Sequence, residues 1–113
     1  MVDGSFLSRD HCKGMVGPGW SRLIDKLFDR IETTGRPVVV IDIKEKFGLL
    51  RISVYGCFWG DLDFIDELEQ ESGTICEDCG DPGKIRDELS WLRTLCRVCL
   101  KKSQLVSAHR AGR

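Results

Sequence analysis

The chain has 113 residues, of which 42% are hydrophobic and 31% are charged, and its formal net charge at pH 7 is −1. This length predicts one domain, or one small domain with an appended module. The near-neutral total argues against nucleic-acid binding through chain-wide positive charge, and no apolar run approaches the roughly 20 residues of a membrane span. Because no apolar segment typical of a secretory signal is present, we expect a cytoplasmic protein without a membrane partner.

The beginning of the chain predicts a tail followed by one helix. Residues 1–16 are polar and Gly-rich without a sustained period, so we expect a flexible or loosely docked tail, and GPG at 17–19 interrupts regular structure. From residue 20 onward, apolar side chains recur at helical spacing with charged residues between them, which is typical of an amphipathic helix on a core. The apolar stripe consists of Trp20, Leu23, Ile24, Leu27, Phe28 and Ile31. Gly35 and Pro37 are expected to end this helix.

The next segment predicts a β-hairpin. β-Branched residues dominate 38–43 and recur at 52–54, which indicates strands over about 38–45 and 49–55 with Gly48 near the turn. Strict alternation assigns the following residues to the core face: Val39, Ile41, Ile43, Leu50, Ile52 and Val54. A two-stranded sheet is not stable alone, so the hairpin must pack on a helix.

Residues 60–73 predict a second helix with an acidic outer face. Asp61 is a plausible N-cap, and a partial apolar stripe follows it. Residues 61–80 carry eight acids and no base, which is typical either of a solvated face or of a surface that meets a basic partner. The candidate partner-binding residues are Asp61, Asp63, Asp66, Glu67, Glu69 and Glu71.

The strongest motif is a set of four cysteines, arranged as two C-x-x-C pairs with sixteen residues between them. Zinc takes four soft ligands in a tetrahedron, and each C-x-x-C turn places two sulfurs on one edge of it. The sequence therefore predicts one structural Zn²⁺ bound by Cys76, Cys79, Cys96 and Cys99.

The residues around the cysteines indicate the type of finger. Gly80 follows the first pair, a short hairpin fits near 84–86 and 91–94, and helix-forming residues follow the second pair. Knuckle, hairpin and helix start resemble a treble-clef zinc finger. The fold class is therefore expected to be α+β, with an α-β-β-α body over 17–73, the finger over 74–108 and a C-terminal tail over 109–113.

Other uses of the thiols fit less well. Rubredoxin-like iron sites normally have both pairs on Gly-containing turns, and a thioredoxin-like redox pair would leave the second pair unexplained. Cys12 and Cys57 are interpreted as a tail thiol and a small buried residue. His11 beside Cys12 offers too few ligands for a second metal site.

The finger is basic, because residues 81–113 carry eight bases and three acids. Phosphate contacts need Lys or Arg gathered on one face, and these cations could equally balance the charge of the thiolates. The candidate nucleic-acid-binding residues are Lys84, Arg86, Arg93, Arg97, Lys101 and Lys102.

Four segments in order, GWSRLI at 19–24, IKEKFGLLRISVYG at 43–56, CEDCG at 76–80 and WLRTLCRVC at 91–99, resemble a family of small bacterial and bacteriophage-borne proteins. The resemblance implies a helix–hairpin–helix body, a C-terminal finger with zinc on the four cysteines, and no known catalytic residue. It also implies action in a bacterial host cell, where small phage proteins of this size often bind and block a host complex, including CRISPR effectors.

No catalytic constellation is evident. Residues 80–108 contain no His, and no G-x-S-x-G, P-loop or H-E-x-x-H motif is present. We therefore expect a non-enzymatic binding protein whose partner is a host protein or complex, with a nucleic-acid-binding regulator as the alternative. Tyr55, Phe58 and Trp59 could anchor a partner or a second copy of the chain, giving a homodimer.

Overall fold

The computed structural model describes residues 7–35, 37–56 and 59–111, with the side chains of residue 59 and of 107–111 left aside. Its elements are the helices α1 (Arg9–Met15), α2 (Ser21–Thr34), α3 (Trp59–Ser72) and α4 (Arg97–Ala111), the 3₁₀ turn η1 (Pro18–Trp20), and the strands β1 (Val39–Lys46), β2 (Leu49–Tyr55), β3 (Lys84–Arg86) and β4 (Arg93–Leu95). The protein is thus α+β, with two small antiparallel sheets, β1–β2 and β3–β4.

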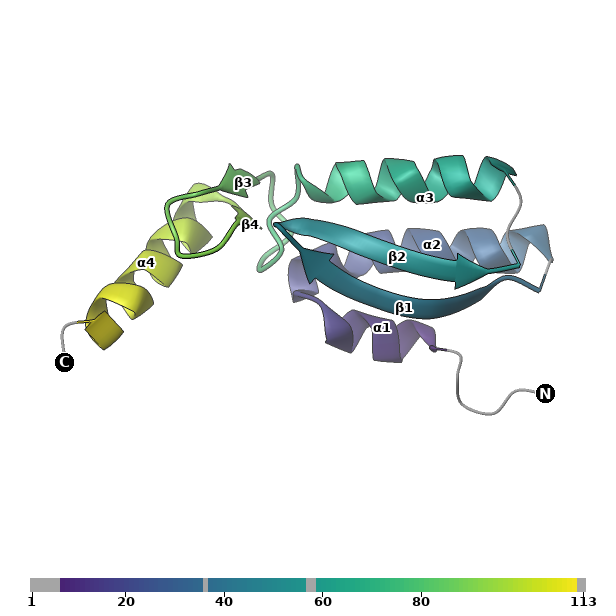
Figure 1. Ribbon diagram of the computed structural model, residues 1–113, viewed down its shortest axis with the longest axis horizontal. Helices are drawn as coiled ribbons and strands as arrows, with labels where there is room; N and C mark the ends of the chain where they lie inside the picture. Colours follow the sequence, from purple (N-terminus) through teal and green to yellow (C-terminus); the bar gives the residue numbers. More distant parts are fainter. Residues whose placement is uncertain (1–6, 36, 57–58, 112–113) are drawn as a thin grey trace.

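The elements form an elongated molecule with extents of 52 × 27 × 17 Å. Helices α1, α2 and α3 pack with the hairpin β1–β2 into a body, and β3, β4 and α4 form the finger at its far end (Figure 1). No helix in the described part of the chain is long and apolar enough to cross a membrane.

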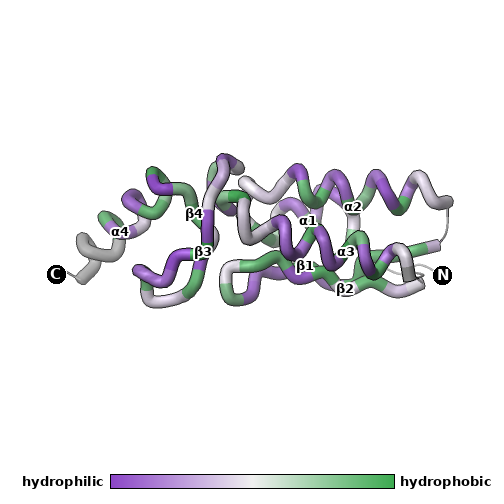
Figure 2. The backbone as a smooth tube through the Cα atoms, turned by 90° about the horizontal axis from the view of Figure 1, so that it is seen from above, coloured by the Kyte–Doolittle hydropathy of each residue, from purple (hydrophilic) through white to green (hydrophobic). Residues whose placement is uncertain are grey.

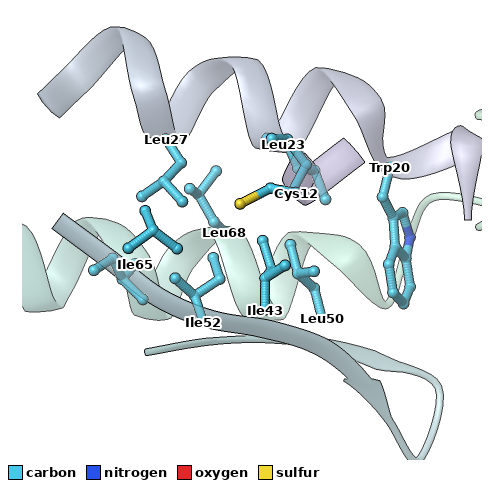
Figure 3. Close-up of a cluster of buried hydrophobic side chains, with 11 residues drawn as sticks. Cys12, Trp20, Leu23, Leu27, Ile43, Leu50, Ile52, Ile65 and Leu68 are labelled. Carbon is cyan, nitrogen blue, oxygen red and sulfur yellow. The ribbon is translucent and has the colours of Figure 1, made fainter. Parts of the chain in front are cut away.

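Helix α2 supplies one side of the body core, as its apolar stripe predicts. Leu23, Ile24 and Leu27 of α2 and Trp20 of η1 are almost fully buried in one cluster with side chains of the hairpin and α3. Figure 3 shows Trp20, Leu23 and Leu27 pointing toward those side chains. The opposing side chains come from β1, β2 and α3: Val40, Ile43, Leu50, Ile52, Ile65 and Leu68. Helices α2 and α3 therefore pack against the apolar face of the hairpin, and this contact supplies the packing that a two-stranded sheet needs.

The alternation predicted for β1 is wrong in its first half. Val40 and Ile43 are buried, whereas Ile41 is 47% exposed. The register between the strands shifts between Val40 and Asp42, so that Ile41 is the extra residue of a β-bulge. Because a bulge inserts one residue, it reverses the faces on either side of it. Val39 is consequently only half-buried, on the outer face.

The segment expected to be an N-terminal tail contains helix α1, so that expectation is wrong for residues 9–15. The Ser8 side chain caps α1 by accepting a hydrogen bond from the His11 N–H. Cys12 is fully buried in the body core, so it is not a tail thiol. Arg9 and α2 are tied by ion pairs, including one of 2.8 Å to Asp25. At the other end, α4 extends to Ala111 and thus into the expected C-terminal tail.

Helix α3 begins two residues before the predicted N-cap. Asp61 lies within its first turn, is only 4% exposed, and accepts a hydrogen bond from Arg30 Nε at 3.1 Å. Near the other end of α3, Glu69 accepts a hydrogen bond from the Ile52 N–H at 2.9 Å. The hydroxyl of Ser72 likewise accepts one from the N–H of β2 residue 50. These side chains satisfy the outer edge of β2, which an isolated hairpin would leave unpaired.

Candidate metal centre

The four cysteines of the motif lie together, as the spacing predicts. Their four Sγ atoms are all within 4.8 Å of one another, and those of Cys79 and Cys96 are 3.6 Å apart. A tetrahedral site with metal–sulfur bonds of about 2.3 Å has sulfur–sulfur separations of about 3.8 Å. The cluster therefore has the size and the ligand chemistry of a four-cysteine metal site, and it could bind a metal ion.

The first pair lies on a tight knuckle. The Gly80 N–H donates to the Cys76 carbonyl at 2.9 Å, and the Cys76 N–H donates to the Asp81 carbonyl at 2.7 Å. Gly80 has φ +87°, a conformation that side chains strongly disfavour. The glycine that follows the first pair is therefore required by the turn, as expected from the sequence.

The second pair lies at the start of α4. Cys96 immediately precedes the helix and Cys99 is in its first turn. The Cys99 N–H donates a hydrogen bond to Cys96 Sγ at 3.4 Å, and this bond is the main cause that lowers the pKa of the Cys96 thiol to about 7. Burial raises the pKa of Cys99 well above its usual range. A bound metal ion would replace these protons, because metals bind the thiolate form.

The knuckle rests directly on the body. The Gly19 N–H donates to the Glu77 carbonyl at 2.8 Å, and Trp20 Nε1 donates to the Ile75 carbonyl at 2.9 Å. A Cβ on Gly19 would collide with the carbonyl oxygen of Cys76. The GPG segment therefore packs directly against the first cysteine pair, in addition to interrupting regular structure before α2.

A buried carboxylate links the knuckle to the second sheet. Glu77 is 6% exposed and accepts a hydrogen bond from the Thr94 N–H at 3.0 Å. Arg93 donates to Glu77 and, at 2.6 Å, to Asp78. Burial raises the pKa of Glu77, and Arg93 and the Thr94 amide oppose that rise. The sequence analysis assigned Glu77 no role, because only the pairing of distant segments identifies it.

Three of the six acidic residues expected to form a partner surface have roles inside the fold. Asp61 is bound by Arg30, and Glu69 accepts from the edge of β2. Glu71 forms an ion pair with Lys26 at 3.0 Å. The other three are exposed and have no ionic partner among the described residues: Asp63, Asp66 and Glu67.

The basic residues of the finger divide in the same way. Arg93 is bound by Glu77 and Asp78, and Arg86 Nε donates to the Leu95 carbonyl at 3.0 Å. The other four candidate cations of the finger are exposed and have no ionic partner among the described residues: Lys84, Arg97, Lys101 and Lys102.

The structure describes some of the remaining candidate residues from the sequence and not others. His11 is exposed while its neighbour Cys12 is buried, and the four-cysteine cluster is the only group of three or more potential metal ligands within the described ranges. Tyr55 is 72% exposed at the end of β2. Cys57, Phe58 and the Trp59 side chain lie outside the described residues.

Fold and site together define an α+β protein whose four-cysteine cluster, capable of binding a metal ion, is built into the junction between body and finger. Comparisons with protein-family models, with curated proteins and with solved structures find no match for this chain. Its function must therefore be argued from its own residues.

Proposed function

We propose that the chain is a non-enzymatic binding protein that holds one structural Zn²⁺ in a treble-clef-like finger. The observation that carries the proposal is the closed set of four sulfurs, all within 4.8 Å of one another. Zinc is the common metal for such a set, and four thiolates leave no coordination position for a substrate water. Cys76, Cys79, Cys96 and Cys99 would hold the ion and so fix the knuckle against the start of α4.

The partner surface that we favour is the acidic face of α3, defined here as Asp63, Asp66 and Glu67. These carboxylates are exposed and unengaged within the described structure, so they remain available to a basic surface. Such a surface is typical of proteins that hold nucleic acid. We infer that the partner is a host complex in the bacterial cytoplasm, such as a CRISPR effector, as the segments quoted in the sequence analysis lead us to expect.

The metal is tested by analysing the purified protein, which should contain about one zinc per chain. Cys96→Ser should lose the metal and the fold of the finger, because metal binding and folding are coupled. Cys12→Ala is the matched control, since this thiol is buried in the body and should leave the zinc content unchanged. A folded protein with no bound metal and four reactive finger thiols would refute the zinc proposal.

The partner is tested by capture from host lysate with mass spectrometry. Reversing Asp63, Asp66 and Glu67 to Lys should abolish capture of the specific partner while leaving the zinc content unchanged. Glu69 is excluded from this set because its loss would disturb the edge of β2. Retention of the partner by the reversed variant would exclude the acidic face of α3.

A second candidate function is nucleic-acid binding by the finger. The observation that favours it is a group of four exposed finger cations that have no ionic partner among the described residues: Lys84, Arg97, Lys101 and Lys102. If this candidate is correct, the protein should be retained on DNA or RNA, and retention should weaken steeply with salt. Reversing Arg97 and Lys101 to Glu should then abolish retention.

A further inference from the structure

Helix α4 exposes a face that combines apolar and basic side chains. Val98 and Leu105 are each 63% exposed, and Lys101 and Lys102 lie between them at helical spacing. Neither lysine has an ionic partner among the described residues, and the helix contains no Asp or Glu. Cys99 and Leu100 face the finger instead. The α4 face, defined as Val98, Lys101, Lys102 and Leu105, is therefore open.

Helix α3 exposes a face of the opposite charge. Asp63, Asp66, Glu67 and Gln70 are exposed at the same i, i+3, i+4, i+7 spacing, and Leu62 is exposed beside them. The helix contains no Lys or Arg. The α3 face is defined as these five residues, and its three carboxylates are the ones on α3 that have no ionic partner among the described residues.

The two faces lie at opposite ends of one molecule. α3 packs on β2 and α2 in the body, whereas α4 packs on β4 at the far end of a 52 Å long chain (Figures 1 and 2). The α4 face therefore has to find its complement outside its own chain, and a second copy carries one of matching charge and spacing.

We propose that the α4 face of one copy binds the α3 face of a second copy, and that two such contacts close a reciprocal dimer. In an antiparallel arrangement Lys101 and Lys102 lie opposite Asp66 and Glu67, while Leu105 lies beside Leu62. Opposite charges at matched helical spacing fix register and orientation, and the exposed leucines supply apolar contact.

The size of the contact explains why it is reciprocal. A helix of 15 residues is about 22 Å long, so one helix pair is short of the roughly 1,600 Å² that a standard stable interface buries. Two-fold symmetry makes the same contact twice, because each copy contributes one α3 face and one α4 face. The net charge of −1 adds little long-range repulsion between copies.

The dimer is tested on the purified full-length chain alone, by sedimentation equilibrium over the micromolar range. We expect a monomer–dimer equilibrium that weakens with salt. The double variants Lys101→Glu/Lys102→Glu and Asp66→Lys/Glu67→Lys should each raise the dimer dissociation constant by at least about tenfold, because they place like charges opposite each other.

Charge complementation separates a direct contact from a general charge effect. The two double variants mixed together should restore dimerisation, because each acidic α4 then meets a basic α3 and each basic α4 meets an acidic α3. Matched controls change the net charge by the same amount at exposed positions outside both helices: Lys44→Glu/Lys46→Glu and Asp87→Lys/Glu88→Lys. These controls should dimerise like the unaltered protein.

Several results would overturn the proposal. They are a chain that stays monomeric throughout the range, a dimer insensitive to both double variants, failure of the mixture to recover, or growth into assemblies larger than a dimer. The test needs no external partner, so its failure leaves the zinc and partner proposals standing. The dimer and an external partner would compete for the same carboxylates of α3, so a partner that binds there should dissociate the dimer. If the Lys101→Glu/Lys102→Glu variant loses only nucleic-acid binding, the α4 face belongs to the second candidate function.

Discussion

The Thr94 hydroxyl in β4 donates a hydrogen bond of 2.5 Å to the carbonyl of Gly48, in the turn between β1 and β2. Thr94 is fully buried, and its backbone N–H is bound by Glu77 from the knuckle. One residue thus joins the body hairpin, the second sheet and the first cysteine pair. The finger is consequently fastened to the body, and we expect the two to respond together when the metal is lost.

Removing the metal should therefore disturb the body core. Trp20 is buried there and donates through its indole to the Ile75 carbonyl, one residue before Cys76. In a Trp59→Phe/Trp91→Phe background, where Trp20 is the remaining tryptophan, chelation should shift its emission to longer wavelength and lower the unfolding temperature. Cys96→Ser in the same background should show the shifted emission before chelator is added. Unchanged Trp20 emission after metal loss would mean that the body folds independently of the finger.

Thr94→Val tests the contribution of the hydrogen bond between the Thr94 hydroxyl and the Gly48 carbonyl. Valine keeps the shape but removes the donor, which leaves the buried Gly48 carbonyl without its hydrogen bond, so the free energy of unfolding should fall by about 1–3 kcal/mol. Thr74→Val is the matched control, because its hydroxyl donates to the Glu71 carbonyl at an exposed site and should cost less. Urea unfolding followed by circular dichroism measures both. Equal small losses of unfolding free energy for the two variants would show that the Thr94–Gly48 hydrogen bond contributes little to stability.

The parts of the structure that could be predicted are those with a local periodic signal. Spacing of 3.6 residues located α2 and its buried face, the paired C-x-x-C motifs located the cluster, and the helix-forming residues around and after the second pair indicated α4. Helix α1 could not be predicted in this way, because Cys12 is its only buried residue and Arg9 gains its partners from α2.

Contacts between segments that are distant in the chain could not be predicted from the sequence either. The contact of Gly19 with the knuckle joins segments more than fifty residues apart, and neither segment signals the other. The phase of β1 was ambiguous because residues 38–41 are all apolar, so alternation alone could not identify Ile41 as the bulge. The acidic stretch of α3 could not be divided into surface and structural carboxylates until Arg30 and the β2 edge were placed.

The bulge predicts opposite outcomes for two neighbouring isoleucines. Ile43→Ala should lower the free energy of unfolding by about 2–5 kcal/mol, because Ile43 is fully buried in the body core. Ile41→Ala should lower it by less than about 1 kcal/mol, since its side chain is 47% exposed and lies outside the core cluster. Denaturant unfolding of the two variants makes the comparison directly. A large loss of unfolding free energy in Ile41→Ala would indicate that Ile41 faces the core, as simple alternation along β1 predicts.

Acid should weaken the attachment of α1 to α2. Lys13 and Arg9 each contact Asp25 Oδ1 at 2.8 Å, and these hydrogen bonds hold the pKa of Asp25 below its ordinary value. A carboxyl whose pKa is lower in the folded state contributes stability above its unfolded pKa of about 3.9, and that contribution is lost as the pH falls through the folded pKa. Asp25→Asn should therefore lower the unfolding temperature at pH 7 and flatten its decline below about pH 4. The control is Asp87→Asn, at an exposed carboxylate of the finger without an ionic partner in the described chain. Parallel pH profiles for the unaltered protein and Asp25→Asn would show that this ion pair does not contribute to folding.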